Sequence, residues 1–174
     1  MKFTELRIPG AFQIELEPRG DARGFFARAF CQEEFASHGL NPTIAQANLS
    51  VSKERGTVRG MHFQRPPHGE AKTVRCTRGR IFDVLVDLRK DSPTYLGWLG
   101  VELSATNHRM LYIPEMCAHG FLTLEDDSEV VYNTSSSYAP AAEGGIRHDD
   151  PAVGIQWPAE IRVISDKDRD WPLL

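Results

Sequence analysis

The sequence predicts an all-β protein, a barrel or jelly roll of about ten short strands with a few short helices. Short runs of β-branched and aromatic residues recur along the chain, separated by Gly, Pro, Asn, Asp and Ser. Helical signal is scarce, because only residues 32–38, closed by Gly39, and part of the C-terminal tail could form helices. A length of 174 residues fits a single domain, which we expect to span residues 1–174.

The expected strands follow each other with turn residues between them. In chain order they are 11–17, 24–30, 43–51, 57–64, 72–76, 80–88, 97–103, 110–113, 121–124 and 129–134. Alternation is clearest in the sixth run, where one face takes Phe82, Val84, Val86 and Leu88 and the other takes Ile81, Asp83, Leu85 and Asp87. A barrel of this kind offers one obvious site, its mouth or interior, lined by every second residue of several strands.

Composition narrows the function. Hydrophobic residues make up 41% of the chain and charged residues 25%, which is ordinary for a globular domain. The net charge is −4 and no Lys/Arg block is present, so a nucleic-acid-binding surface is not indicated. An anionic small-molecule ligand remains compatible, because a few Arg and Lys can converge in one pocket of an acidic protein.

Cysteine usage and hydropathy predict a cytoplasmic location without membrane association. Cys31, Cys76 and Cys117 are odd in number and form no C-x-x-C pair, which suits reduced thiols. The first residues contain no apolar stretch that could serve as a signal peptide. No apolar run approaches the ~20 residues of a membrane helix.

A metal site is not expected. Small β-barrels that bind metals commonly take two histidines from an H-x-H pair, but here the second position is Gln64. A later segment offers one further imidazole, His119. Two imidazoles without a firm carboxylate fall short of the usual three protein ligands.

Without a metal, His62 is either an acid–base residue or a histidine hydrogen-bonded in a strand. Its company favours the first interpretation, since Arg59 lies three residues before it and Lys72 opens the next strand. Strict alternation would put Arg59 and His62 on opposite faces. Gly60 between them could host a β-bulge that returns both to one pocket.

Eight motifs, in order along nearly the whole chain, resemble those of the dTDP-4-dehydrorhamnose 3,5-epimerase family. They are the segments DARGFF from Asp21, RGMHFQ from Arg59, FDVLVDLR from Phe82, SPT from Ser92, IPE from Ile113, AHGF from Ala118, YAP from Tyr138 and DDP from Asp149. The resemblance implies a cupin-type jelly roll, usually a homodimer. It also implies action without a metal or other cofactor on a nucleotide-linked 4-keto-6-deoxyhexose.

The implied chemistry matches the residue types. A ketone at C4 acidifies the protons at C3 and C5, and imidazole is the natural base for removing one of them near neutral pH. By resemblance His62 is that base, Asp168 orients it, and Tyr132 donates a proton from the opposite face. Lys72 would stabilise the enolate oxygen. Asp166 is the alternative carboxylate, out of register with the family's Ser-x-Lys-Asp ending.

The resemblance also implies substrate-binding residues. Arg23 and Arg59 would contact the diphosphate, with Gln46 and Asn48 supporting them. Tyr138 would stack on the nucleotide base, and His119 would hydrogen-bond the sugar. Weaker correspondences, both plausible as solvent-facing residues, are Glu143 and Lys167.

Three departures from the family concern the substrate. Arg28 stands where the family usually has Glu, at a position associated with the nucleotide; arginine only donates, so a cytidine nucleotide is one hypothesis, and an Arg28 that points to solvent is the alternative. Ala47 and Leu49 replace Asp and His, and Asn133 replaces Lys. Inversion at C3, at C5 or at both stays open. The rival functions are a non-catalytic sugar-nucleotide-binding barrel and a metal-dependent cupin.

Overall fold

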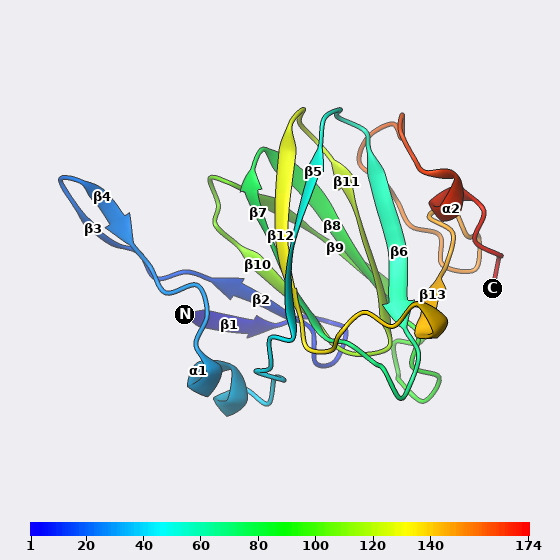
Figure 1. The fold of residues 1–174 in the computed structure, drawn as a ribbon, viewed down its shortest axis with the longest axis horizontal. Helices are drawn as coiled ribbons and strands as arrows, with labels where there is room; N and C mark the ends of the chain where they lie inside the picture. Colours follow the sequence, from blue (N-terminus) through cyan, green and yellow to red (C-terminus); the bar gives the residue numbers. More distant parts are fainter.

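A computed structural model describes residues 1–174, and two antiparallel β-sheets that pack face to face dominate it (Figure 1). The six-stranded sheet has the order β1 (Lys2–Glu5), β2 (Phe12–Glu15), β10 (Met110–Ile113), β7 (Lys72–Arg78), β12 (Ser128–Thr134), β5 (Gln46–Ser52). The five-stranded sheet has the order β13 (Glu143–Gly145), β6 (Val58–Gln64), β11 (Cys117–Thr123), β8 (Arg80–Asp87), β9 (Trp98–Ser104). The predicted all-β jelly roll of the cupin type is confirmed.

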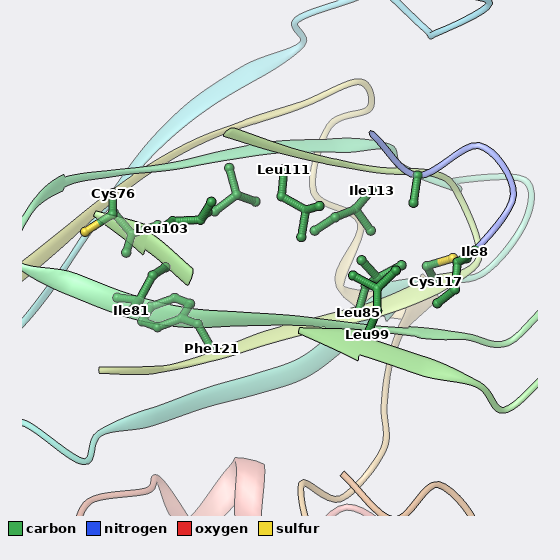
Figure 2. Packing of buried hydrophobic residues seen from close by; sticks show 13 residues of the cluster. Ile8, Cys76, Ile81, Leu85, Leu99, Leu103, Leu111, Ile113, Cys117 and Phe121 are labelled. Carbon is green, nitrogen blue, oxygen red and sulfur yellow. The ribbon is translucent and has the colours of Figure 1, made fainter. Parts of the chain in front are cut away.

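The main core lies between the two sheets and is drawn in Figure 2. Leu111 and Ile113 enter it from the six-stranded sheet, and Ile81, Leu85 and Phe121 enter it from the five-stranded sheet. The predicted alternation along β8 is confirmed, because its other face packs in a separate outer cluster beneath the C-terminal segments. This core therefore holds the two sheets together.

The remaining elements are short. They are the hairpin β3 (Arg19–Asp21) and β4 (Gly24–Phe26), the helices α1 (Gln32–Ser37) and α2 (Asp166–Arg169), and the 3₁₀ turn η1 (Pro140–Ala142). The hairpin projects away from the packed sheets, whereas α2 lies beside β6 (Figure 1). The two predicted helical regions are confirmed, and Gly39 ends the first with a φ of 73°.

Several strand boundaries differ from the prediction. The expected strand 24–30 ends at Phe26, because the chain turns there out of a hairpin rather than into a sheet. Strand β11 begins at Cys117 instead of Phe121, and strands β1, β3 and β13 were not predicted. The unpredicted Glu143–Gly145 strand has no β-branched residue and forms through backbone pairing with β6.

Cys31, Cys76 and Cys117 are all free. Burial raises the pKa of Cys76 to about 11 and that of Cys117 to about 12, so both remain protonated thiols at neutral pH. None of the helices has the length and apolarity needed to cross a bilayer.

Candidate active site

A cavity of about 540 Å³ opens between the two sheets. From the six-stranded sheet it is lined by Gln46, Asn48, Ser50, Lys72, Tyr132 and Thr134. From the five-stranded sheet and the C-terminal region it is lined by Arg59, His62, Phe63, Gln64, His119, Phe121, Glu143, Lys167 and Asp168, and from loops by Glu70 and Tyr138. The structure thus brings together every predicted site residue except Arg23 and Arg28.

A β-bulge at Gly60 places Arg59 and His62 in the same cavity. His119 on β11 pairs with His62 on β6, but Phe121 pairs with Arg59, so β6 has one extra residue in this stretch. Gly60 has a φ of 123°, and a Cβ there would lie 2.5 Å from the Cα of Gly120. The bulge predicted from the glycine is present.

His62 forms a close pair with Asp168. Nε2 of His62 lies 2.6 Å from Oδ1 of Asp168, and Oδ2 of the same carboxylate accepts a hydrogen bond of 3.1 Å from the N–H of Gly60. Burial alone would raise the pKa of Asp168, but the hydrogen bond and charge of His62, the Gly60 N–H and Ser165 together lower it. The carboxylate is therefore ionised, which fixes the imidazole and stabilises its charged form.

The carboxylate reaches β6 because of local structure near the C-terminus. Ser165 caps α2, and its Oγ accepts a hydrogen bond of 3.2 Å from the N–H of Asp168. The neighbouring Asp166 is exposed and pairs with Arg169 at 2.9 Å. Trp171, one turn further on, lies edge-on to His62 with ring centroids 6.3 Å apart.

Lys72 is held at the opposite wall. Its Nζ lies 3.0 Å from Oε1 of Glu70 and donates to the carbonyl of His62 at 3.2 Å. Side chains of Lys72 and Glu70 are only 8% and 10% exposed, so the ion pair is largely shielded from solvent. With two of its donors engaged, the ammonium retains one for a ligand in the cavity.

Tyr132 faces the cavity from β12, in the sheet opposite His62. Burial raises the pKa of its phenol, and the negative charge of Glu70 raises it further, while Arg59 opposes this effect. The hydroxyl is therefore protonated at neutral pH and can donate.

His119 forms a second pair with a carboxylate. Its Nε2 lies 2.8 Å from Oδ1 of Asp83, which is fully buried on β8. Asp83 and Glu70 were not predicted as site residues. Alternation places Asp83 on one face of its strand, but its partner depends on the β8–β11 register, which local sequence does not reveal.

A polar chain closes one side of the cavity. Glu143 accepts hydrogen bonds from Lys167 at 2.6 Å and from the hydroxyl of Tyr138 at 3.0 Å. Burial raises the pKa of Glu143, but these two bonds outweigh it and lower the pKa. The N–H of Tyr138 also donates to Gln46 at 2.9 Å, so its aromatic ring is anchored while 53% of the residue stays exposed. An exposed, anchored ring is suited to stacking on a planar ligand.

The guanidinium of Arg59 on β6 contacts strand β5 of the other sheet. It donates to the hydroxyl of Ser52 at 3.0 Å and to the carbonyl of Val51 at 3.1 Å. No carboxylate neutralises it in the structure, so its charge is available to an anionic ligand in the cavity.

Arg23 and Arg28 lie away from this cavity. Arg23 is on the β3–β4 hairpin, where its Nη2 lies 2.5 Å from Oδ2 of Asp21. Arg28 follows the hairpin and lies 3.3 Å from Glu34 of α1. Within one chain, therefore, neither guanidinium reaches the predicted substrate site.

Gln64 occupies the position where an H-x-H pair would have its second histidine. Its side-chain amide is hydrogen-bonded to backbone groups. Its amide donates to the carbonyls of His68 and Ser137 at 3.0 and 3.2 Å and accepts from the N–H of Ala139 at 2.6 Å. No three His, Cys, Asp or Glu side chains gather as a metal-binding group would.

Comparison with known proteins agrees with this geometry. The model of the family described as dTDP-4-dehydrorhamnose 3,5-epimerase matches residues 5–174. The dTDP-4-dehydrorhamnose 3,5-epimerase of Methanothermobacter thermautotrophicus is 47% identical over 174 residues, covering 98% of this chain and 92% of that protein. A dTDP-4-dehydrorhamnose 3-epimerase of Streptomyces niveus is 43% identical over 175 residues, covering 100% of this chain and 84% of that protein.

A solved structure is similar throughout. The crystal structure of the Bacillus anthracis dTDP-4-dehydrorhamnose 3,5-epimerase, with TDP and PPi bound, has a TM-score of 0.95 and 40% identity, and the match covers 99% of both chains. Both sequence and fold therefore match over the full length. The chain belongs to the dTDP-4-dehydrorhamnose 3,5-epimerase family, and it is an isomerase that epimerises a nucleotide-linked 4-keto-6-deoxyhexose next to the ketone.

Proposed function

We propose that His62 and Tyr132 carry out this epimerisation from opposite walls of the cavity. The observation that carries the proposal is the 2.6 Å contact between His62 and Asp168, in a cavity that Tyr132 and Lys72 also line. Asp168 occupies Nε2, so Nδ1 is the ring nitrogen left to take a proton from C3 or C5. The imidazolium that forms is stabilised by the ionised carboxylate.

The enolate then needs stabilisation at the C4 oxygen. Lys72 supplies a fixed positive charge, since Glu70 and the His62 carbonyl hold its ammonium beside the base. A proton returned from the face opposite His62 inverts the carbon. Tyr132 is the donor, because it projects from the facing sheet and its phenol is protonated.

The test is incubation with dTDP-4-dehydro-6-deoxyglucose in deuterium oxide. Deuterium found at C3, at C5 or at both, by NMR of the product, identifies the carbons that are inverted. No deuterium at either carbon, at high enzyme concentration, would refute the epimerase mechanism and favour a non-catalytic sugar-nucleotide-binding barrel.

Substitution of Tyr132 separates proton removal from proton return. In Tyr132→Phe we expect His62 still to remove the proton and to return a deuteron to the same face. Exchange without inversion should therefore rise relative to inversion, which should fall by roughly a hundredfold or more. Equal loss of exchange and inversion would contradict the assignment of Tyr132 as the opposite-face donor.

The proposed nucleotide is dTDP. Support comes from the names of the relatives, which specify dTDP sugars, and from the TDP in the Bacillus anthracis crystal structure. Arg28, which motivated the cytidine alternative, pairs with Glu34 outside the cavity of its own chain. A competition binding measurement tests this choice. We expect dTDP to displace bound ligand far better than CDP, and the reverse order would establish the cytidine alternative.

We also propose that the protein works as a homodimer in which the β3–β4 hairpin reaches the partner's cavity. The hairpin projects from the body of its own chain, with Phe25 and Phe26 52% and 71% exposed (Figure 1). The edge strand β5 adds exposed Leu49 and Val51 beside the site. Such apolar surface on a monomer is typical of a protein interface.

Mixing two variants tests the exchange of hairpins. Arg23→Ala lacks the guanidinium on the hairpin, and His62→Ala lacks the base in the cavity. If the hairpin acts in the partner's cavity, mixed dimers regain one complete site, and activity should return on mixing. Activity that stays at the level of the separate variants, in dimers shown to exchange subunits, would refute a hairpin that acts in the partner's cavity.

The proposed location is the cytoplasm. Three free cysteines, two of them buried as protonated thiols, suit a reducing compartment. Fractionation of cells that make the protein from its own gene tests this, and enzyme found outside the cytoplasmic fraction would refute it.

A further inference from the structure

The cavity contains a second histidine–aspartate pair that the mechanism above does not use. His119 stands directly opposite His62 in the β11–β6 register, so the two imidazoles enter the cavity side by side. Nε2 of His119 is bound by Asp83 at 2.8 Å, as Nε2 of His62 is bound by Asp168.

Asp83 is an unusual residue for its position. It projects from the central part of β8 on the same face as Ile81 and Leu85, which belong to the main core (Figure 2). Asp83 is 0% exposed, and its Oδ2 has no hydrogen-bond partner in the chain. A buried carboxylate with one unpaired oxygen stabilises a fold less than an apolar side chain of similar size. Its contribution therefore lies in what it does to His119.

The two ring nitrogens of His119 are in different situations. Nε2 is engaged by Asp83, whereas Nδ1 makes no hydrogen bond and is not sealed in the interior. The ring lines the cavity, so Nδ1 is the atom that a ligand meets. A carboxylate acceptor selects the tautomer with its proton on Nε2, which leaves the lone pair on Nδ1.

We infer that Asp83 is a positioning residue that fixes His119 as a hydrogen-bond acceptor for a hydroxyl of the hexose. The inference rests on the proposed function, because it takes the sugar to lie against His62. A 4-keto-6-deoxyhexose linked through C1 has free hydroxyls only at C2 and C3. An acceptor beside the base selects sugars that carry such a hydroxyl next to the reacting carbon, since a missing donor leaves Nδ1 unpaired.

NMR of the free enzyme tests the tautomer without any reaction. Two-bond ¹H–¹⁵N correlations of the ¹⁵N-labelled protein, assigned with His119→Ala, report which ring nitrogen of His119 carries the proton. We expect Nε2–H in the wild type and loss of this preference in Asp83→Asn. Asp87→Asn is the matched control: Asp87 is equally buried on the same strand face but binds Arg89, so the His119 signals should not change. Nδ1–H in the wild type, or an unchanged tautomer in Asp83→Asn, would overturn the inference.

Activity with a 2-deoxy substrate analogue tests the recognition. Wild-type enzyme should use the 2-deoxy analogue with a kcat/KM roughly tenfold to a hundredfold below that of the full substrate. Asp83→Asn should lose most of this discrimination while retaining deuterium exchange with the full substrate. Equal discrimination by both enzymes would overturn the inference. If the wild-type enzyme incorporates deuterium into none of the substrates, that result would instead refute the proposed function and would leave the NMR result unaffected.

Folding of a third variant keeps the test independent of stability. Asp83→Leu replaces the carboxylate with an apolar side chain of similar shape in an apolar environment. It should be at least as resistant to urea as the wild type and yet lose the discrimination against the 2-deoxy analogue. A stable Asp83→Leu enzyme with wild-type discrimination would show that Asp83 has no effect on recognition.

Discussion

The two histidine–aspartate pairs of the cavity lie on neighbouring strands but are built differently. Asp168 comes from the short terminal helix α2, and both of its oxygens have partners, His62 and the Gly60 N–H. Asp83 comes from the middle of β8, and only one of its oxygens has a partner. The side chain of His62 is 33% exposed, and that of His119 is 9% exposed.

Under the proposed mechanism, this difference separates a group that changes charge from one that holds a fixed geometry. A base must gain and lose a proton in each cycle, so it needs an accessible ring and a carboxylate that remains ionised throughout. The first pair has both. The second pair is locked into the core by a strand and is almost closed to solvent, which suits a group that orients the substrate.

The largest expected effect separates the two histidines directly. His62→Ala should lower the rate of deuterium exchange on the order of ten-thousandfold, because it removes the imidazole that the proposed mechanism assigns to proton removal. His119→Ala should lower kcat/KM only roughly tenfold to a hundredfold, because one hydrogen bond to the sugar is lost. Both are measured by NMR in deuterium oxide, with circular dichroism to verify folding. Comparable losses in the two variants would remove the functional distinction between the pairs.

A smaller effect on activity is expected when Asp168, the carboxylate paired with His62, loses its charge. Asp168→Asn keeps the size of the side chain but stabilises the imidazolium of His62 less, so kcat should fall on the order of a thousandfold. Retention of near wild-type kcat would mean that the negative charge of Asp168 is not needed by the base.

The same carboxylate makes stability depend on pH. The pKa of Asp168 in the folded protein lies below its ordinary value of 3.8, so its stabilising contribution is fully present above that value. The contribution is lost as the pH falls through the lower folded pKa. Urea unfolding at neutral and acidic pH should therefore show a smaller acid-induced loss of stability in Asp168→Asn than in the wild type. An equal loss in both proteins would contradict this linkage.

Local sequence sufficed for the parts of the site that depend on strand alternation and on glycine. The bulge followed from Gly60 standing between Arg59 and His62, and the strands that carry Lys72 and Tyr132 were predicted within one or two residues. The choice of Asp168 over Asp166 came from family resemblance, and the structure places Asp168 against His62 and Asp166 in solvent.

The parts that could not be predicted depend on contacts distant in sequence. Asp83 meets His119 only because β8 pairs with β11 in one register, and a strand pattern does not determine its neighbour. Glu70 precedes its strand in a loop with no pattern of its own. Arg23 and Arg28 were assigned to the substrate site by resemblance, whereas the structure of one chain puts both beyond its reach.

The smallest expected effect concerns the helix that carries Asp168. Ser165→Ala removes the cap of α2 and should lower the free energy of unfolding by about 1 kcal/mol, measured by urea denaturation. Activity should fall far less than in Asp168→Asn, because His62 and the Gly60 N–H still hold the carboxylate. Ser165→Thr, which retains a capping hydroxyl, is the control and should resemble the wild type. If Ser165→Ala were as inactive as Asp168→Asn, the cap rather than the carboxylate's own contacts would position the first pair. The two carboxylates would then differ in the element that holds them, helix α2 for Asp168 and strand β8 for Asp83, and not in their hydrogen bonds.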